Sequence, residues 1–173
     1  MMRKRIIVCG LNGAGKSTFG RALAKELDCA FFDIEDFYFP DRREGDAYVS
    51  SIPREEVSSR LLAALKESSA FVLASVTADY GGAAEACFDL AVFLHVPDEV
   101  RMQRVRTRSF SKFGARMLPG GDLYEQEEQF FSLVKKRREE RVSSWLERTG
   151  IPVVHLDGTL PVEENLRRFR LGE

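Results

Sequence analysis

The segment that most constrains this chain is the glycine-rich octapeptide GLNGAGKS at residues 10–17. It directly follows a short apolar run, Arg5–Cys9, and precedes a pattern in which Phe19, Leu23 and Leu27 recur at a four-residue step. The sequence therefore predicts a buried strand, a tight turn and an amphipathic helix, in that order. The glycines allow the backbone to curl so that successive N–H groups point inward, where they bind phosphate oxygens.

The end of the octapeptide carries the residue types of a nucleotide site. Its pattern G-x-x-x-x-G-K-[ST] places Lys16 where an ammonium group reaches the β- and γ-phosphates, and Ser17 where a hydroxyl binds Mg²⁺. The following helix adds the positive end of its dipole. We therefore expect ATP and Mg²⁺ as cofactors. The loop residues expected to bind the nucleotide are Asn12, Gly13, Ala14, Gly15, Lys16, Ser17 and Thr18.

Four further runs of nearly continuous apolar residues predict four more strands, Ala30–Ile34, Ala70–Ser75, Leu90–Val96 and Pro152–Leu156. Helical patterns alternate with the strands at Gly15–Leu27, Pro53–Lys66, Pro97–Arg108, Leu123–Arg148 and Val162–Phe169. Continuous apolar strands are typical of a parallel sheet covered on both faces. The alternation predicts an α/β protein, a three-layer sandwich around a five-stranded parallel sheet.

Carboxylates gather in the stretch FFDIED, at the predicted end of the second strand. Asp33 lies at the carboxyl end of that strand, where open α/β sheets bind ligands. We expect Asp33 or Asp36 to orient an acceptor hydroxyl and accept its proton, and Asp33 to support Ser17 in holding the metal. The structural alternative is a solvated strand end with an Asp that caps the next helix. The third strand does not end in Asp, which argues against motor-like or ring-forming ATPases.

A basic segment follows the fourth strand. Arg104 and Arg108 are four residues apart and share a helix face, from which they can neutralise charge on a transferred phosphoryl group. A solvated basic helix is the structural alternative. The segments Phe37–Ile52 and Ser109–Gly121 are long for connections in a compact domain. We therefore expect residues 37–69 to bind the acceptor and residues 109–121 to form a lid.

Composition sets the remaining expectations. With 173 residues and a net charge of -1, the chain is expected to form a single domain, residues 1–173, without bulk attraction to nucleic acid. No apolar run approaches the roughly 20 residues that span a bilayer, so no membrane partner is expected. Widely spaced cysteines in odd number predict reduced thiols and a cytoplasmic location. The histidines, His95 and His155, lie inside apolar runs and are interpreted as ordinary strand residues.

Several segments resemble the small P-loop kinases of the nucleoside monophosphate kinase fold, which include adenylate kinases and shikimate kinases. GLNGAGKST resembles their phosphate loop. FFDIED resembles the D-x-D of shikimate kinases, with Asp33 matching the first acid and Glu35 replacing the second. VPDEVRMQRVRTR is similar to the segment that enters the adenylate-kinase lid, which implies that Arg104 stacks on adenine and Arg108 contacts phosphate.

The same resemblance reaches the end of the chain. HLDGTLPVEEN looks like the loop after the last strand, which implies that Gly158 and Thr159 border the adenine, and the implied sheet order is 2-3-1-4-5. One departure concerns the acceptor. SVTADYGG lacks the arginine that grips the acceptor phosphate in adenylate kinases, so Arg42, Arg43 or Arg54 would have to replace it.

These observations predict a Mg²⁺- and ATP-dependent kinase that phosphorylates a small-molecule acceptor, such as a nucleoside or nucleotide. Two alternatives remain open. One is a nucleotide-binding switch or accessory NTPase without a small acceptor. The other is a polynucleotide-end kinase, against which the near-neutral net charge argues. Both a monomer and a homodimer are compatible with the sequence.

Overall fold

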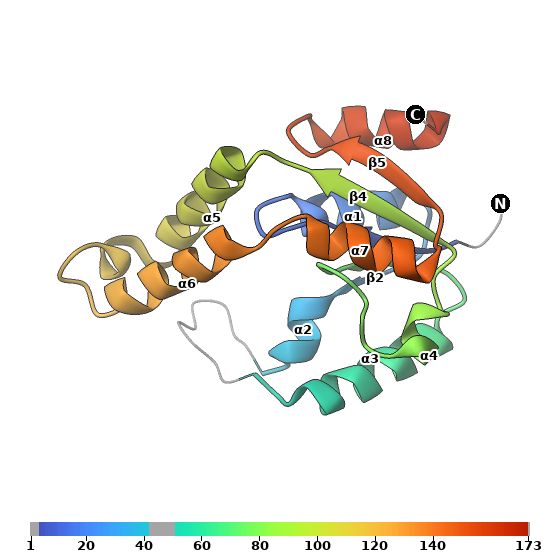
Figure 1. Cartoon of the computed structure of the whole chain (residues 1–173), viewed down its shortest axis with the longest axis horizontal. Coiled ribbons are helices and arrows are strands. Elements are labelled where there is room, and N and C mark those ends of the chain that lie inside the picture. Colours follow the sequence, from blue (N-terminus) through green and yellow to red (C-terminus); the bar gives the residue numbers. More distant parts are fainter. Residues whose placement is uncertain (1–3, 42–50, 173) are drawn as a thin grey trace.

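A computed structural model describes residues 4–41 and 51–172 and contains one parallel sheet with the strand order β2-β3-β1-β4-β5 (Figure 1). The strands are β1 (Arg5–Cys9), β2 (Ala30–Asp33), β3 (Phe71–Ala74), β4 (Leu90–His95) and β5 (Val153–Asp157). All five predicted strands are confirmed, to within one residue at either end. The sheet order implied by the resemblance is confirmed as well.

Helices cover both faces of the sheet (Figure 1). Ile6 and Val8 of β1 pack in one core cluster, whereas Ile7 and Cys9 pack in the other, and all four side chains are fully buried. Successive side chains of a strand point to opposite faces, so a strand buried on both sides reads as a continuous apolar run. The first cluster includes residues of α1 (Lys16–Glu26) and α8 (Val162–Leu171), and the second includes residues of α3 (Arg54–Glu67) and α7 (Glu140–Thr149).

A helical hairpin extends from the sheet at the left of Figure 1. It consists of α5 (Asp98–Phe113), the short 3-10 helix η1 (Gly114–Met117) and α6 (Tyr124–Lys136). Val105, Met117, Phe131 and Val134 form its own small core. The predicted lid segment Ser109–Gly121 is therefore more regular than expected, because α5 continues to Phe113 and η1 follows at once.

The predicted helix Leu123–Arg148 is two helices, because the chain is extended at Arg137 and α7 begins only at Glu140. Two short helices, α2 (Ile34–Tyr38) and α4 (Gly82–Glu85), were not predicted. The expected acceptor segment Phe37–Ile52 is described only in part, and Arg42 and Arg43 lie outside the described residues. Within residues 4–41 and 51–172, no helix has the length and apolar content to cross a membrane.

The core assignment can be tested with two leucines of different exposure. Leu61 of α3 is fully buried, so Leu61→Ala should lower the free energy of unfolding by about 2–5 kcal/mol through lost burial and a residual cavity. Leu133 of α6 is 60% exposed, so Leu133→Ala should change it by less than about 0.5 kcal/mol. Denaturant unfolding of both variants measures the difference. Equal losses would contradict the proposed burial of Leu61.

Candidate active site

A cavity of about 650 Å³ opens at the carboxyl ends of the central strands, and we call it the central cavity. The connections that follow β1 and β4 leave in opposite directions at these carboxyl ends. Open α/β sheets bind ligands at such a point. The cavity is lined by the phosphate loop, the end of β2, the segment after β3, α5 and the start of α7. Of the predicted site residues, it brings together Asn12, Gly13, Gly15, Lys16, Ser17, Thr18, Asp33, Arg104 and Arg108.

Four predicted site residues do not line the central cavity. Ala14 is buried within the phosphate loop, and Asp36 lies exposed on α2. Gly158 packs against the phosphate loop, since a Cβ there would lie 2.8 Å from the Ala14 carbonyl oxygen. The Thr159 hydroxyl donates to Asp157 at 2.6 Å.

The phosphate loop depends on backbone conformations that favour glycine. Gly13 and Gly15 have φ values of 83° and 92°, in the left-handed region. At Gly13 a Cβ would also lie 2.5 Å from the Arg101 carbonyl oxygen, so the loop packs directly on α5. The Ala14 N–H donates to the Leu11 carbonyl at 3.1 Å and closes the turn. The curl expected from the sequence is therefore present.

The two predicted metal-binding residues are in direct contact. The Ser17 hydroxyl donates to one oxygen of Asp33 at 2.5 Å, and the other Asp33 oxygen accepts from the Glu35 N–H at 3.1 Å. Asp33 therefore caps α2 and faces the phosphate loop at the same time. Hydroxyl and carboxylate oxygens are the ligands that Mg²⁺ prefers, so this pair fits the ion. Among the described residues no three His, Cys, Asp or Glu side chains could hold a metal alone, as is usual where phosphates and water supply most ligands.

Lys16 lies at the base of the loop. Its ammonium donates to the Leu11 carbonyl at 3.0 Å. Burial lowers the pKa of Lys16 to about 8, although Glu35 and Asp33 raise it in part. A triphosphate beside this group would favour its charged form and raise the pKa again.

Arg104 connects three segments of the site. Its guanidinium donates to the Gly13 carbonyl at 3.3 Å and to the Gly158 carbonyl at 2.9 Å, while the Gly158 N–H donates to the His95 carbonyl at 2.8 Å. The phosphate loop, the end of β4 and the loop after β5 are thus held together from α5. The resemblance implied that Arg104 stacks on adenine, and in this structure its guanidinium bonds to the backbone of Gly13 and Gly158.

One side of the central cavity faces α3 and the segment after β3, and we name it the acceptor side after the expectation from the sequence. It contains a cluster that the sequence did not single out as a whole. Arg54 of α3 lies over the Tyr80 ring at 4.9 Å and donates to the Asp79 carbonyl at 2.6 Å. Arg141 of α7 lies 3.6 Å from the Asp79 carboxylate. The Tyr80 hydroxyl donates a hydrogen bond to the Tyr38 hydroxyl at 3.3 Å. Burial, and to a lesser extent this hydrogen bond, raises the pKa of Tyr80. Tyr80 therefore stays protonated.

Arg137 reaches the phosphate loop from the break between α6 and α7. Its guanidinium donates to the side-chain oxygen of Asn12. Burial, followed by repulsion from Arg141 and Arg101, lowers the pKa of Arg137. The binding of an anion next to a guanidinium that is surrounded by like charges is favourable, because the anion reduces their repulsion. The charge run KKRREER at residues 135–141 was the only sequence signal for this group.

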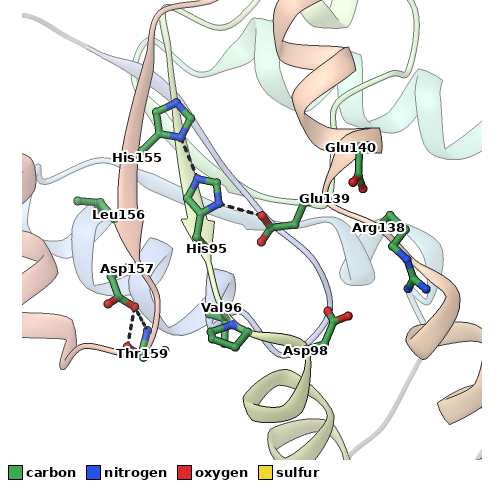
Figure 2. A pocket seen from close by; sticks show the side chains of 11 residues that line it. His95, Val96, Asp98, Arg138, Glu139, Glu140, His155, Leu156, Asp157 and Thr159 are labelled. Carbon is green, nitrogen blue, oxygen red and sulfur yellow. Dashed lines mark hydrogen bonds and ion pairs between the residues drawn. The ribbon is translucent and has the colours of Figure 1, made fainter.

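A second cavity of about 750 Å³ lies beside the edge of the sheet (Figure 2). His95 of β4 and His155 of β5 face each other there, with a ring-nitrogen distance of 2.8 Å. His95 also contacts the Glu139 carboxylate at 3.0 Å, just before α7 begins. Both histidines lie on strands, and their interpretation as residues without a catalytic or ligand role remains a prediction.

The sheet order, the phosphate loop and the arginine-bearing helix together define a P-loop protein with the nucleoside monophosphate kinase-like fold. The chain belongs to the AAA domain family (AAA_18), whose profile matches residues 6–115. These residues extend from β1 through the phosphate loop and the cavity-lining face of α5 to η1.

Individual relatives agree with this assignment. The chain is 27% identical over 175 aligned positions to the uncharacterized protein YqaC of Bacillus subtilis, covering 96% of both chains. It is 28% identical over 160 positions to a bifunctional shikimate kinase/3-dehydroquinate synthase of Thermotoga maritima, covering 87% of this chain and 32% of that protein. The crystal structure of a gluconokinase from Sinorhizobium meliloti 1021 has the same fold, with a TM-score of 0.60, 18% identity, and coverage of 99% and 91%.

The pKa of Lys16 gives a prediction for nucleotide binding. Because the free protein loses the Lys16 proton near pH 8, its affinity for Mg-ATP should fall as the pH rises through about 8, and binding there should take up protons. Calorimetry in buffers of different ionisation enthalpy measures both effects. Lys16→Arg is the matched control, because arginine stays charged and should remove the pH dependence. Affinity of the unsubstituted protein that is constant across this range would contradict the prediction.

Proposed function

We propose that this protein is a Mg²⁺- and ATP-dependent kinase that transfers the γ-phosphoryl group to a hydroxyl of a small metabolite. The observation that carries the proposal is the position of Asp33. It contacts Ser17 of the phosphate loop at 2.5 Å and lines the same cavity as Lys16 and the acceptor-side residues. A carboxylate between the phosphates and an acceptor pocket has the position of a base that prepares a hydroxyl for attack.

The position of each cavity residue suggests a separate role in the transfer. Lys16 and Arg108 offer positive charge to the triphosphate, and Ser17 with Asp33 would hold Mg²⁺, which neutralises phosphate charge when it is bound. Asp33 accepts the hydroxyl proton as the acceptor oxygen bonds to the γ-phosphorus. The bond from that phosphorus to the bridging oxygen breaks, and ADP leaves with the electron pair. Because Asp36 is exposed and outside the cavity lining, its part in this step is disfavoured.

The charge of the acceptor side favours an acceptor with an anionic group. Arg54 and Arg141 flank the Asp79 carboxylate, but Arg137 contacts an amide oxygen and is repelled by neighbouring arginines. An acceptor carboxylate or phosphate would relieve that repulsion. Similar proteins are named for gluconate and shikimate, which are hydroxy acids, and this supports a hydroxy acid as the acceptor class. A nucleotide acceptor, which is also anionic, is the second class to test.

An acceptor screen tests the function itself. ADP release should be measured with Mg-ATP alone and with added hydroxy acids, neutral sugars, nucleosides and nucleoside monophosphates. Acceleration by one hydroxy acid, with formation of its phosphate ester, supports the proposal. Acceleration by a nucleotide alone would replace the acceptor class. A flat screen with hydrolysis stimulated only by a protein partner would instead favour a nucleotide-binding switch.

The role of Asp33 gives a paired prediction. Asp33→Asn should lower turnover by about 10²- to 10⁴-fold, the usual contribution of a positioned base, while Mg-ATP affinity changes much less. Asp36→Asn is the matched control and should change turnover less than about 3-fold, because Asp36 lies exposed outside the cavity lining. Steady-state rates and nucleotide titrations separate the two effects. If Asp33→Asn weakens ATP binding but spares turnover of the bound nucleotide, Asp33 serves only as a metal or structural residue and is not the base.

A further inference from the structure

Three consecutive carbonyl groups of the phosphate loop accept hydrogen bonds from cationic side chains. The Leu11 carbonyl accepts from Lys16 at 3.0 Å, the Asn12 carbonyl from Arg101 at 3.0 Å, and the Gly13 carbonyl from Arg104 at 3.3 Å. Lys16 belongs to the loop, but the two arginines come from successive turns of α5. The α5 helix therefore holds the backbone of the phosphate loop from outside.

The bond from Arg101 fixes one particular peptide group. In a trans peptide the C=O and the following N–H point in opposite directions, so holding the Asn12 carbonyl sets the direction of the Gly13 N–H. Gly13 lines the central cavity, and its backbone packs so closely on the Arg101 backbone that no Cβ would fit. The orientation of this amide is thus determined at Arg101.

The burial of Arg101 separates it from the substrate. Its side chain is only 1% exposed, whereas its partner Asp98 on the same helix is 63% exposed. The Arg101 Nε is buried and, within the described part of the chain, has no hydrogen-bond partner. A buried cation with incomplete compensation is costly, and an anion bound in the adjacent loop reduces that cost. The charge of Arg101 therefore favours phosphate binding without touching phosphate.

We propose that Arg101 is a positioning residue that couples the α5 helix to the phosphate loop and strengthens the binding of a triphosphate. It orients the Gly13 amide through the Asn12 carbonyl and adds a buried positive charge behind the loop. Because it acts on the phosphate-binding backbone, its effect is independent of the nucleotide base. The inference rests on the proposed function only in that ATP is the ligand.

The test compares Arg101→Met and Arg101→Lys with the unsubstituted protein. Binding of Mg-ATP and of magnesium tripolyphosphate, which has no base or ribose, is measured by calorimetry. Arg101→Met should lose about 10- to 100-fold in affinity for both ligands, and by the same factor, as expected for a charge-assisted hydrogen bond. Arg101→Lys keeps the charge without the planar fork and should lose less.

Arg106→Met is the matched control on the same helix. Arg106 is half exposed and pairs with Glu128 of α6, so its loss should leave both affinities unchanged. Thermal unfolding and circular dichroism accompany each titration. If Arg101→Met does not fold, Arg101→Lys alone decides, and unchanged affinity in that variant overturns the proposal.

The remaining outcomes separate this inference from the proposed function. Unchanged binding of both ligands by a folded Arg101→Met variant, with or without a lower melting temperature, would show that Arg101 is merely structural. Loss of ATP binding without loss of tripolyphosphate binding would show that it acts on the base instead, and also overturns the proposal. If the unsubstituted protein binds neither ligand, the proposed function fails and this inference fails with it.

Discussion

The left-handed turn between β1 and α1 is the constraint on which the rest of the site depends. A strand buried on both faces delivers the chain to this turn, and the glycines at 13 and 15 adopt the positive φ values it requires. Within the turn, the Leu11 carbonyl accepts from the Ala14 N–H and from Lys16, but the Asn12 and Gly13 carbonyls find their partners on another segment. Arg101 and Arg104 of α5 supply those partners, and Gly158 packs against the far side. The loop is shaped by contacts that come from much later in the sequence.

Electrostatics distinguishes the two halves of the central cavity. On the side of the phosphate loop, Glu35 and Asp33 raise the pKa of Lys16 in part, whereas Arg108 lowers it. On the acceptor side, Asp79 lies between Arg54 and Arg141 and limits the excess of positive charge there. One carboxylate between two arginines leaves net positive charge on that side, whereas at the phosphate loop two carboxylates lie close to Lys16.

Much of the fold was predictable because each strand and helix is indicated by its own local pattern, a continuous apolar run for a strand and a helical repeat for a helix. The strands, the phosphate loop and the position of Asp33 follow from such signals. The break at Arg137 was not predictable, since KKRREER contains no glycine or proline and favours a helix. At this break, the Arg137 guanidinium donates to Asn12, which lies 125 residues away in sequence.

The burial of a charged side chain was the second feature that the sequence did not predict. An arginine on a basic helix is usually solvated, so nothing marked Arg101 as nearly inaccessible. The facing pair of histidines depends on the register of β4 and β5, in which Phe93 is opposite His155. The register between two strands that are separated by several helices cannot be predicted from the sequence of either strand alone. The residues that line the cavity around the phosphate loop were therefore largely predicted from the sequence, whereas most of those around Asp79 and Tyr80 were not.

The hairpin formed by α5, η1 and α6 joins the rest of the molecule through two short connections, and an arginine near each of them bonds to Asn12. Arg101 holds its carbonyl, and Arg137 holds its side chain. Any swing of the hairpin must carry Asn12 along or rupture one of these links. A ligand that displaced Arg137 would therefore act on the same residue that Arg101 holds. If such a ligand changed the affinity for a second ligand at the phosphate loop, the second ligand would change the affinity for the first by the same factor.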